Sequence, residues 1–437
     1  MFEILKQKSI PIVESLHRRI FGHEMSEEMR KFLGNLSISF FGGAFYSVLL
    51  FIVSILAGRF LGPIDYGKYA LYVSLFSFFT IFLSFGLETT IIRLAAKADA
   101  DMRKKIISTF IFFFFVNAIF WSLISFIFKS LIVKIFGLPV LFIFFALLFS
   151  MTNSIGMIIE NYLKLLNKFL FINIIRVCQG LFLLVFLILL RFLFGEIFSL
   201  SWFIFLSVAA SLLVLVVYFL KAKSYLKFIL DIKTLKELLL FSSFLFLSVI
   251  SGYLIQSGTV ILINKFIGLR DLGLYNAYYS LSLAITGQVI GFFVAAYFPA
   301  LAQSTNKVAA IKKIDKMIPI ITLPWLIISS LIMFFGIKLY GTSYPLDIGI
   351  IVPFSFYSLF YLYGVLYGYI VISNASNILV RNMYAIWFLI VVGYFFVLFL
   401  LSYYLNMTVQ IVLWAQVIAF GINAFLNRAY CDKIINN

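Results

Sequence analysis

Five charged residues lie inside long apolar runs of this sequence, and their side chains are the ones best suited to bind an ionic ligand. Arg93, Arg176 and Arg381 carry guanidinium groups, which bind phosphate oxygens through two parallel hydrogen bonds. Glu88 and Glu160 are the only two of the seventeen acidic residues within these runs. A charge deep in an apolar segment is costly unless it faces a cavity or an opposite charge. The pattern therefore predicts that the arginines bind an anionic head group and that the glutamates are ion-coupling candidates.

Simpler interpretations remain open for three of these residues. Arg93 and Arg381 lie close enough to the ends of their apolar runs for the side chains to reach the membrane surface. Glu160 stands four residues before Lys164, so these two can form an ion pair along one helix. Glu88 and Arg176 lie deeper in their apolar runs, and they are the stronger candidates for function.

Signatures of an enzyme are weak. Asp99 and Asp101 have the spacing of a metal-dependent glycosyltransferase, but they lie in a short basic loop, where a solvated pair is the simpler interpretation. The sequence contains no paired-histidine zinc motif, no phosphate-binding Gly-Lys-Ser/Thr loop and no nucleophile elbow. Cys178 and Cys431 offer neither a disulfide framework nor a metal site. We therefore expect no enzyme activity, no metal and no cofactor.

The composition is that of a protein with many membrane spans. Of the 437 residues, 64% are hydrophobic and 12% are charged, whereas soluble proteins carry about 25% charged residues. Apolar runs long enough to cross a ~30 Å hydrocarbon core recur along the whole chain. We place twelve spans at residues 36–57, 69–94, 106–128, 140–163, 169–191, 200–220, 240–264, 272–298, 317–337, 347–372, 378–403 and 408–427. The predicted fold class is an all-α polytopic membrane protein.

The basic residues predict the orientation of these spans. If the N-terminus is cytoplasmic, 26 of the 34 Lys and Arg residues fall on the inner side and eight on the outer side. Cytoplasmic loops are enriched in Lys and Arg, so both termini are expected inside, and the net charge of +17 is expected to face anionic lipids and not nucleic acid. Residues 11–21 fit an amphipathic helix lying on the membrane, and the first thirty residues do not resemble a cleavable signal peptide.

An internal repeat is visible between residues 59–75 and 265–281. With a constant offset of 206, eight of the seventeen positions are identical: Phe60/Phe266, Gly62/Gly268, Asp65/Asp271, Gly67/Gly273, Tyr69/Tyr275, Tyr72/Tyr278, Ser74/Ser280 and Leu75/Leu281. Six spans separate the two copies, so both enter the membrane in the same direction. This predicts two six-helix bundles related by a parallel repeat, with a site between them near the midplane.

The repeat also predicts the segments of the chain. They are a cytoplasmic N-terminal segment (1–32), an N-terminal six-helix bundle (33–222), a basic cytoplasmic linker (223–236), a C-terminal six-helix bundle (237–430) and a cytoplasmic tail (431–437). At the outer hairpin of the first copy, Gly62 is expected to close the first span in a left-handed conformation and Pro63 to prevent its continuation. Asp65 is expected to cap the second span.

Residues 54–97 carry a family pattern. Its first part, R-x-L-G-x-x-x-Y-G-x-Y, is supplied by Arg59, Leu61, Gly62, Tyr66, Gly67 and Tyr69, and its second part, G-L-x-x-x-x-x-R, by Gly86, Leu87 and Arg93. The stretch FIGLRDLGLYNAYYSL, followed by YFPALAQ with Pro299, is similar to the second half of the same family. The chain thus resembles the polysaccharide-transport family, the O-antigen and repeat-unit flippases of the multidrug/oligosaccharidyl-lipid/polysaccharide (MOP) exporter superfamily.

This resemblance implies a function, a site and partners. The family moves undecaprenyl-diphosphate-linked oligosaccharides from the cytoplasmic to the outer leaflet of the prokaryotic plasma membrane by alternating access, through two V-shaped bundles around a cationic cavity. By implication Arg176, Arg93 and Arg381 contact the diphosphate, and membrane lipids and the polysaccharide polymerase machinery are partners. Because the sequence has no ATP site, energy would come from the membrane potential or from H+ or Na+ coupled through Glu88 and Glu160.

Two alternatives remain. A cation-coupled multidrug exporter of the same superfamily usually holds a carboxylate in its first helix, but residues 33–60 contain no Asp or Glu. A membrane glycosyltransferase or polymerase would need a long acidic loop on the outer face, and the predicted outer connections are short.

Overall fold

The computed structural model describes residues 27–87, 98–195, 198–223, 230–303, 307–374 and 377–436. Within these ranges every regular element is a helix, which confirms the all-α fold class. The predicted interfacial helix at 11–21 lies outside the described residues, and so do Glu88 and Arg93.

The helices follow the predicted spans closely. In the N-terminal part they are α2 (Glu27–Ser84), α4 (Ala100–Ile127), α5 (Lys129–Phe136), α6 (Val140–Leu165), α7 (Phe169–Phe194) and α8 (Leu200–Ala222). In the C-terminal part they are α9 (Ile232–Tyr253), the π-helical turn η3 (Leu254–Gly258), α10 (Thr259–Phe266), α11 (Leu269–Gln303), α12 (Lys307–Tyr340), α13 (Ile348–Asn374), α14 (Asn377–Tyr404) and α15 (Val409–Asn436). Helix α9 begins inside the predicted linker, and α15 continues through the predicted tail.

The first two predicted spans are two helices that meet at a kink at Gly62, and they share the label α2. This glycine has φ 71° and ψ 170°, and Pro63 follows it. The break and the positive φ were both expected there, and this ψ belongs to a region that is essentially open only to glycine. The predicted cap by Asp65 is not formed, because its carboxylate at the start of the second helix pairs with Lys68 at 2.8 Å and accepts no backbone amide of the described residues.

Ten helices among the described residues are long and apolar enough to cross a membrane. The first of the ten, Phe41–Ser84, covers two predicted spans. Large apolar side chains stay on the surface, for example Phe192 at 84% and Phe425 at 79% exposure. A surface this apolar suits lipid and not water, so the chain is a multi-pass membrane protein. Helix α11, which corresponds to the predicted eighth span, is not among the ten, and the count of twelve stays a prediction.

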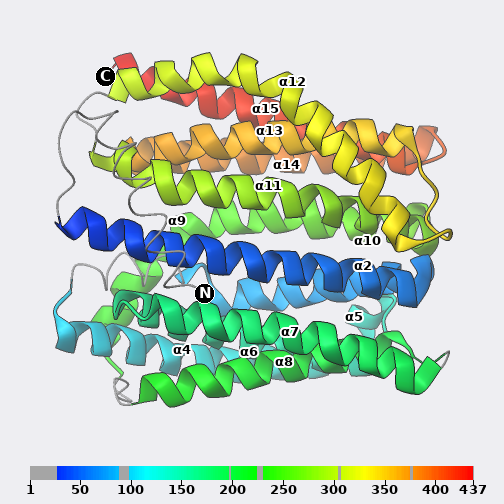
Figure 1. Cartoon of the computed structure of the whole chain (residues 1–437), viewed down its shortest axis with the longest axis horizontal. Coiled ribbons are helices and arrows are strands. Elements are labelled where there is room, and N and C mark those ends of the chain that lie inside the picture. Colours follow the sequence, from blue (N-terminus) through cyan, green and yellow to red (C-terminus); the bar gives the residue numbers. More distant parts are fainter. Residues whose placement is uncertain are drawn as a thin grey trace.

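Helix α2 runs through the middle of the molecule. In Figure 1, α4, α6, α7 and α8 lie on one side of it and α11, α12, α13 and α15 on the other. The helix packs against α6 and α7 and also against α11. The largest buried cluster therefore contains side chains from both predicted bundles, such as Tyr66 and Leu71 from one and Tyr275 and Leu281 from the other.

Two glycines of the repeat let α2 and α11 approach closely. A Cβ atom on Gly67 would overlap the carbonyl oxygen of Leu269, and a Cβ atom on Gly273 would overlap the carbonyl oxygen of Pro63. The four residues form two pairs at the same offset of 206, so the contacts are reciprocal. A two-fold relation between the bundles produces this reciprocity, which supports the predicted repeat at this crossing.

Tyrosine hydroxyls join the two bundles at the same end of the molecule. The Tyr66 hydroxyl lies 2.8 Å from Ser54 Oγ and 3.5 Å from the Tyr340 hydroxyl of α12. The Tyr344 hydroxyl donates to the carbonyl oxygen of Gly58 at 2.8 Å. Because the predicted topology puts this end outside, we call these five residues the outer contact.

Candidate anion-binding site

A tight turn sets two charged residues of neighbouring helices at one level. Helix α6 ends at Leu165 and α7 begins at Phe169, and between them Asn167 adopts a positive φ of 57°. Asn tolerates this left-handed conformation better than most residues. The Lys168 amide donates to the Leu163 carbonyl oxygen at 2.9 Å, which closes the end of α6. The chain therefore reverses at once, and side chains at similar distances from the turn meet.

Glu160 of α6 and Arg176 of α7 form a two-point ion pair across this hairpin. Arg176 Nη2 donates to Glu160 Oε1 at 2.7 Å, and Arg176 Nε donates to Glu160 Oε2 at 3.0 Å. Such a bidentate pair is among the strongest polar contacts in proteins. The Glu160 side chain is only 8% exposed, whereas that of Arg176 is 34% exposed.

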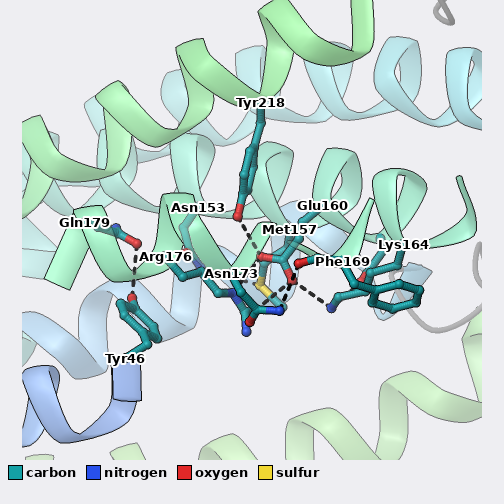
Figure 2. A network of polar contacts seen from close by, with 11 residues as sticks. Tyr46, Asn153, Met157, Glu160, Lys164, Phe169, Asn173, Arg176, Gln179 and Tyr218 are labelled. Carbon is teal, nitrogen blue, oxygen red and sulfur yellow. Dashed lines mark hydrogen bonds and ion pairs between the residues drawn. The ribbon is translucent and has the colours of Figure 1, made fainter. Parts of the chain in front are cut away.

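Two further donors complete the shell of the Glu160 carboxylate. Lys164 Nζ lies 2.7 Å from Oε1, and the Tyr218 hydroxyl of α8 donates to Oε2 at 3.3 Å. Figure 2 shows Arg176 and Lys164 reaching the carboxylate from opposite sides, with Tyr218 coming from α8. A buried carboxylate is thus fully hydrogen-bonded, as its burial requires.

Helix α2 holds Arg176 from a second side. The Tyr46 ring lies 6.0 Å from Arg176 Cζ, within range of a cation–π contact. The Tyr46 hydroxyl in turn donates to Gln179 Oε1 of α7 at 3.1 Å (Figure 2). One turn away, a Cβ atom on Gly42 would overlap the Asn173 side chain, so α2 and α7 are close here. These contacts fix the guanidinium group between three helices.

The cluster carries a net positive charge. One carboxylate, Glu160, is shared by two cations, Arg176 and Lys164, which leaves one unit of positive charge in excess. Both cations are about one third exposed, at 34% and 38%, while the carboxylate is buried. The accessible part of the cluster is therefore cationic, and it suits an anion with two or more oxygens.

The sequence predicted part of this cluster. The Glu160–Lys164 pair along one helix is confirmed. The pair with Arg176 was missed, although a signal existed: both residues lie a few positions from the same short connection, so the hairpin must bring them to one level. Nothing in the sequence pointed to Tyr218, because a tyrosine in an apolar run has no periodicity that marks its partner.

The other predicted site residues lie elsewhere. Arg381 is exposed near the start of α14, in the other bundle, and takes no part in the cluster around Glu160. Glu88 and Arg93 lie outside the described residues. The roles of all five predicted residues stay predictions.

A second arginine–carboxylate pair lies in the C-terminal bundle. Arg428 Nε and Nη2 donate to Asp315 Oδ1 and Oδ2 at 2.8 and 2.7 Å, and the Tyr367 hydroxyl donates to Oδ1 at 2.7 Å. Arg428 also pairs with Asp432. The Arg428–Asp315 pair has the same two-point geometry as the Glu160–Arg176 pair. Its charge balance is the opposite, because two carboxylates on one arginine leave an excess of negative charge.

Polar side chains elsewhere bond between or within helices. Asn117 Nδ2 donates to the carbonyl oxygen of Phe82 at 2.7 Å, and the Tyr275 hydroxyl donates to Gln416 Oε1 at 3.1 Å. Asp99 caps α4 by accepting the Met102 amide at 2.7 Å, which gives the carboxylate a structural role. Within the described part of the chain, no three His, Cys, Asp or Glu side chains gather as a metal site would require.

The carboxylate at the start of α9 has a lowered pKa. Asp231, the N-cap of α9, accepts from Lys105 Nζ at 2.6 Å and from Thr234 Oγ1 at 2.8 Å. The Lys105 and Thr234 hydrogen bonds lower the pKa of Asp231 to about 2. This pair ties α4 to the start of α9, and so links the two bundles at the end opposite the outer contact.

A family model described as polysaccharide biosynthesis protein matches residues 32–305. The chain belongs to this polysaccharide biosynthesis family. The match covers α2 to α11, so the whole cluster around Glu160 lies in the family region. No curated protein matches the sequence.

Solved structures show the fold of this polysaccharide biosynthesis family member. An inward-facing multidrug resistance MATE family transporter of the MOP superfamily superposes with a TM-score of 0.59 at 12% identity, over 92% of this chain and 94% of that chain. The Vibrio cholerae MATE transporter VcmN, solved as a point mutant, superposes with a TM-score of 0.56 at 12% identity, over 93% and 97%. The predicted resemblance to a polysaccharide family is confirmed by the family model, and the fold is that of a transporter of the MOP superfamily.

Proposed function

We propose that this protein is a lipid-linked oligosaccharide flippase, which moves an undecaprenyl-diphosphate-linked glycan repeat unit from the cytoplasmic to the outer leaflet for surface polysaccharide biosynthesis. The observation that carries this proposal is the cationic cluster of Arg176 and Lys164, set within the spans of a polysaccharide biosynthesis family member. A diphosphate supplies the paired oxygens that a guanidinium fork and an ammonium group bind.

The wider site extends this cluster to other predicted residues. Arg93 and Arg381 would contact the same diphosphate or guide it, and Glu88 would take part in coupling to H+ or Na+. The predicted topology puts all of these residues in the cytoplasmic half of a plasma-membrane protein with both termini inside. The lipid tail would stay in the bilayer, and the polysaccharide polymerase machinery would receive the glycan.

Alternating access would require the outer contact to open. Tyr66 and Tyr340 meet across the two bundles, and Tyr344 reaches the Gly58 carbonyl oxygen. These contacts are neutral hydrogen bonds, each of which contributes about 1 kcal/mol. A closed outer end fits a state that receives its substrate from the cytoplasm and then opens outward.

The MATE-like fold makes cation-coupled drug export the second candidate. MATE transporters share the fold, but the likeness at 12% identity extends no further. Drugs exported by cation coupling are commonly cationic, and the excess positive charge around Arg176 would repel them. A glycosyltransferase or polymerase is a weaker third candidate, because Asp99, its sequence signature, serves as a helix cap.

Mass spectrometry of lipids bound to the purified protein tests the proposal. We expect a polyprenyl-diphosphate glycan to co-purify with the wild-type chain and to be lost from Arg176→Gln. The matched control is Arg191→Gln, which changes an arginine at the other end of α7. Equal amounts of lipid-linked glycan in both variants would refute the arginine site, and absence of such a lipid together with efflux of cationic dyes would favour the drug exporter.

A further inference from the structure

Glu160 presents the same chemistry to Arg176 that a phosphate group would present. Its two oxygens accept hydrogen bonds from Nε and Nη2 of the guanidinium group at 3.0 and 2.7 Å, and Oε1 also accepts from Lys164. Phosphate oxygens bind arginine through the same kind of two-point fork. The edge of Arg176 that faces Lys164 is therefore filled by an anion belonging to the protein.

The Glu160 carboxylate has one hydrogen-bond donor besides the two cations. The Tyr218 hydroxyl donates to Oε2 from α8, and this donor is independent of both cations. A carboxylate released by both cations would keep that hydrogen bond but lose its paired charges, so diphosphate binding would have to offset this cost. Arg176 would keep its contact with the Tyr46 ring, so neither partner of the broken pair would be left without an interaction.

We infer that Glu160 is a stand-in anion, whose carboxylate occupies Arg176 and Lys164 until the diphosphate of the substrate replaces it. The inference rests on the proposed function and adds two roles to it: Lys164 is a substrate-binding residue, and Glu160 is a competitor of the substrate. In the empty site the Glu160 carboxylate compensates one of the two positive charges. It also limits affinity, because a transport site must bind well enough to load and weakly enough to unload.

The exchange predicts opposite effects for two neighbouring residues. Glu160→Gln removes the competing charge while it keeps the side-chain shape and an acceptor for Tyr218, so diphosphate affinity should rise about tenfold. Lys164→Gln removes one of the two cations, so affinity should fall about fivefold. Asp315→Asn is the matched control, because Asp315 forms the same two-point pair with Arg428 in the other bundle. Its affinity should stay within about twofold of the wild type.

Isothermal titration of the purified full chain with geranylgeranyl diphosphate measures these affinities, and geranylgeraniol serves as the ligand without a diphosphate. Unchanged or weaker binding by a folded Glu160→Gln variant would overturn the stand-in role, even if Arg176→Gln abolishes binding and so upholds the proposed function. If Glu160→Gln does not fold, Lys164→Gln decides, because wild-type affinity in that variant excludes Lys164 from the site. No diphosphate binding by the wild-type chain would overturn both the inference and the proposed function.

Discussion

Replacing Arg176 by methionine should destabilise the protein through the carboxylate that it leaves behind. Glu160 is 8% exposed and would lose both hydrogen bonds from the guanidinium group. Breaking a buried ion pair from one side costs about 3–5 kcal/mol. Arg176 is 34% exposed, and Lys164 and Tyr218 would still contact the carboxylate. We therefore expect a loss of about 2 kcal/mol in the free energy of unfolding, which is below that range.

A double substitution separates this cause from simple loss of packing. Adding Glu160→Gln to Arg176→Met removes the stranded charge but keeps an acceptor for Tyr218, so about 1 kcal/mol of the lost stability should return. Equilibrium unfolding in detergent, followed by tryptophan fluorescence, gives the free energies of unfolding for the wild type, the two single variants and the double variant. Strictly additive losses, or a double variant less stable than Arg176→Met, would refute the argument from the buried charge.

Three further predictions concern the contacts between the bundles. Gly67→Ala should cost about 1–3 kcal/mol, because its methyl group would overlap the backbone of α11; Gly43→Ala, with open space around the new Cβ atom, should cost nothing, and equal unfolding free energies in the two variants would contradict this. The carboxylate of Asp231, with its pKa lowered to about 2, stabilises the folded state above the unfolded pKa near 4 and loses that effect as the pH falls toward 2. From pH 5 to pH 2 the midpoint temperature of thermal unfolding should therefore fall more steeply for the wild type than for Asp231→Asn. Parallel plots of this temperature against pH for the two proteins would exclude the effect. Tyr344→Phe should remove the hydrogen bond to the Gly58 carbonyl oxygen and cost about 1 kcal/mol in the free energy of unfolding, and a variant as stable as the wild type would contradict this.

The fold could be predicted well because the membrane imposes simple rules on the sequence. Apolar runs of the right length mark helices, and the bounds of α6 and α7 came out within a few residues of the expected ones. The break at Gly62 was also predictable, because Gly-Pro punctuates a helix. The close approach of α2 and α11 at Gly67 and Gly273 was not predictable, since it depends on how the two bundles pack.

The sequence indicated which charged residues belong to the site, but it did not indicate which of them pair with one another. Arg176 and Glu160 stood out because charges inside apolar runs are rare. Their pairing depends on the turn at Asn167 and on helix rotation, which the sequence does not state. Asp315 and Arg428 were missed altogether, because the ends of α12 and α15 were expected to be loops and the helices extend further into the polar segments.

Transport in proteoliposomes tests the central claim most directly. A fluorescent polyprenyl-diphosphate glycan is placed in the membrane with the purified full chain, and its transfer between leaflets is followed by quenching with a reagent that cannot cross the bilayer. We predict that the wild-type chain transfers the lipid faster than protein-free liposomes, and that Arg176→Gln reduces this rate to the protein-free level while Arg191→Gln does not. Transfer at the wild-type rate by Arg176→Gln, or no transfer by the wild type, would contradict the account.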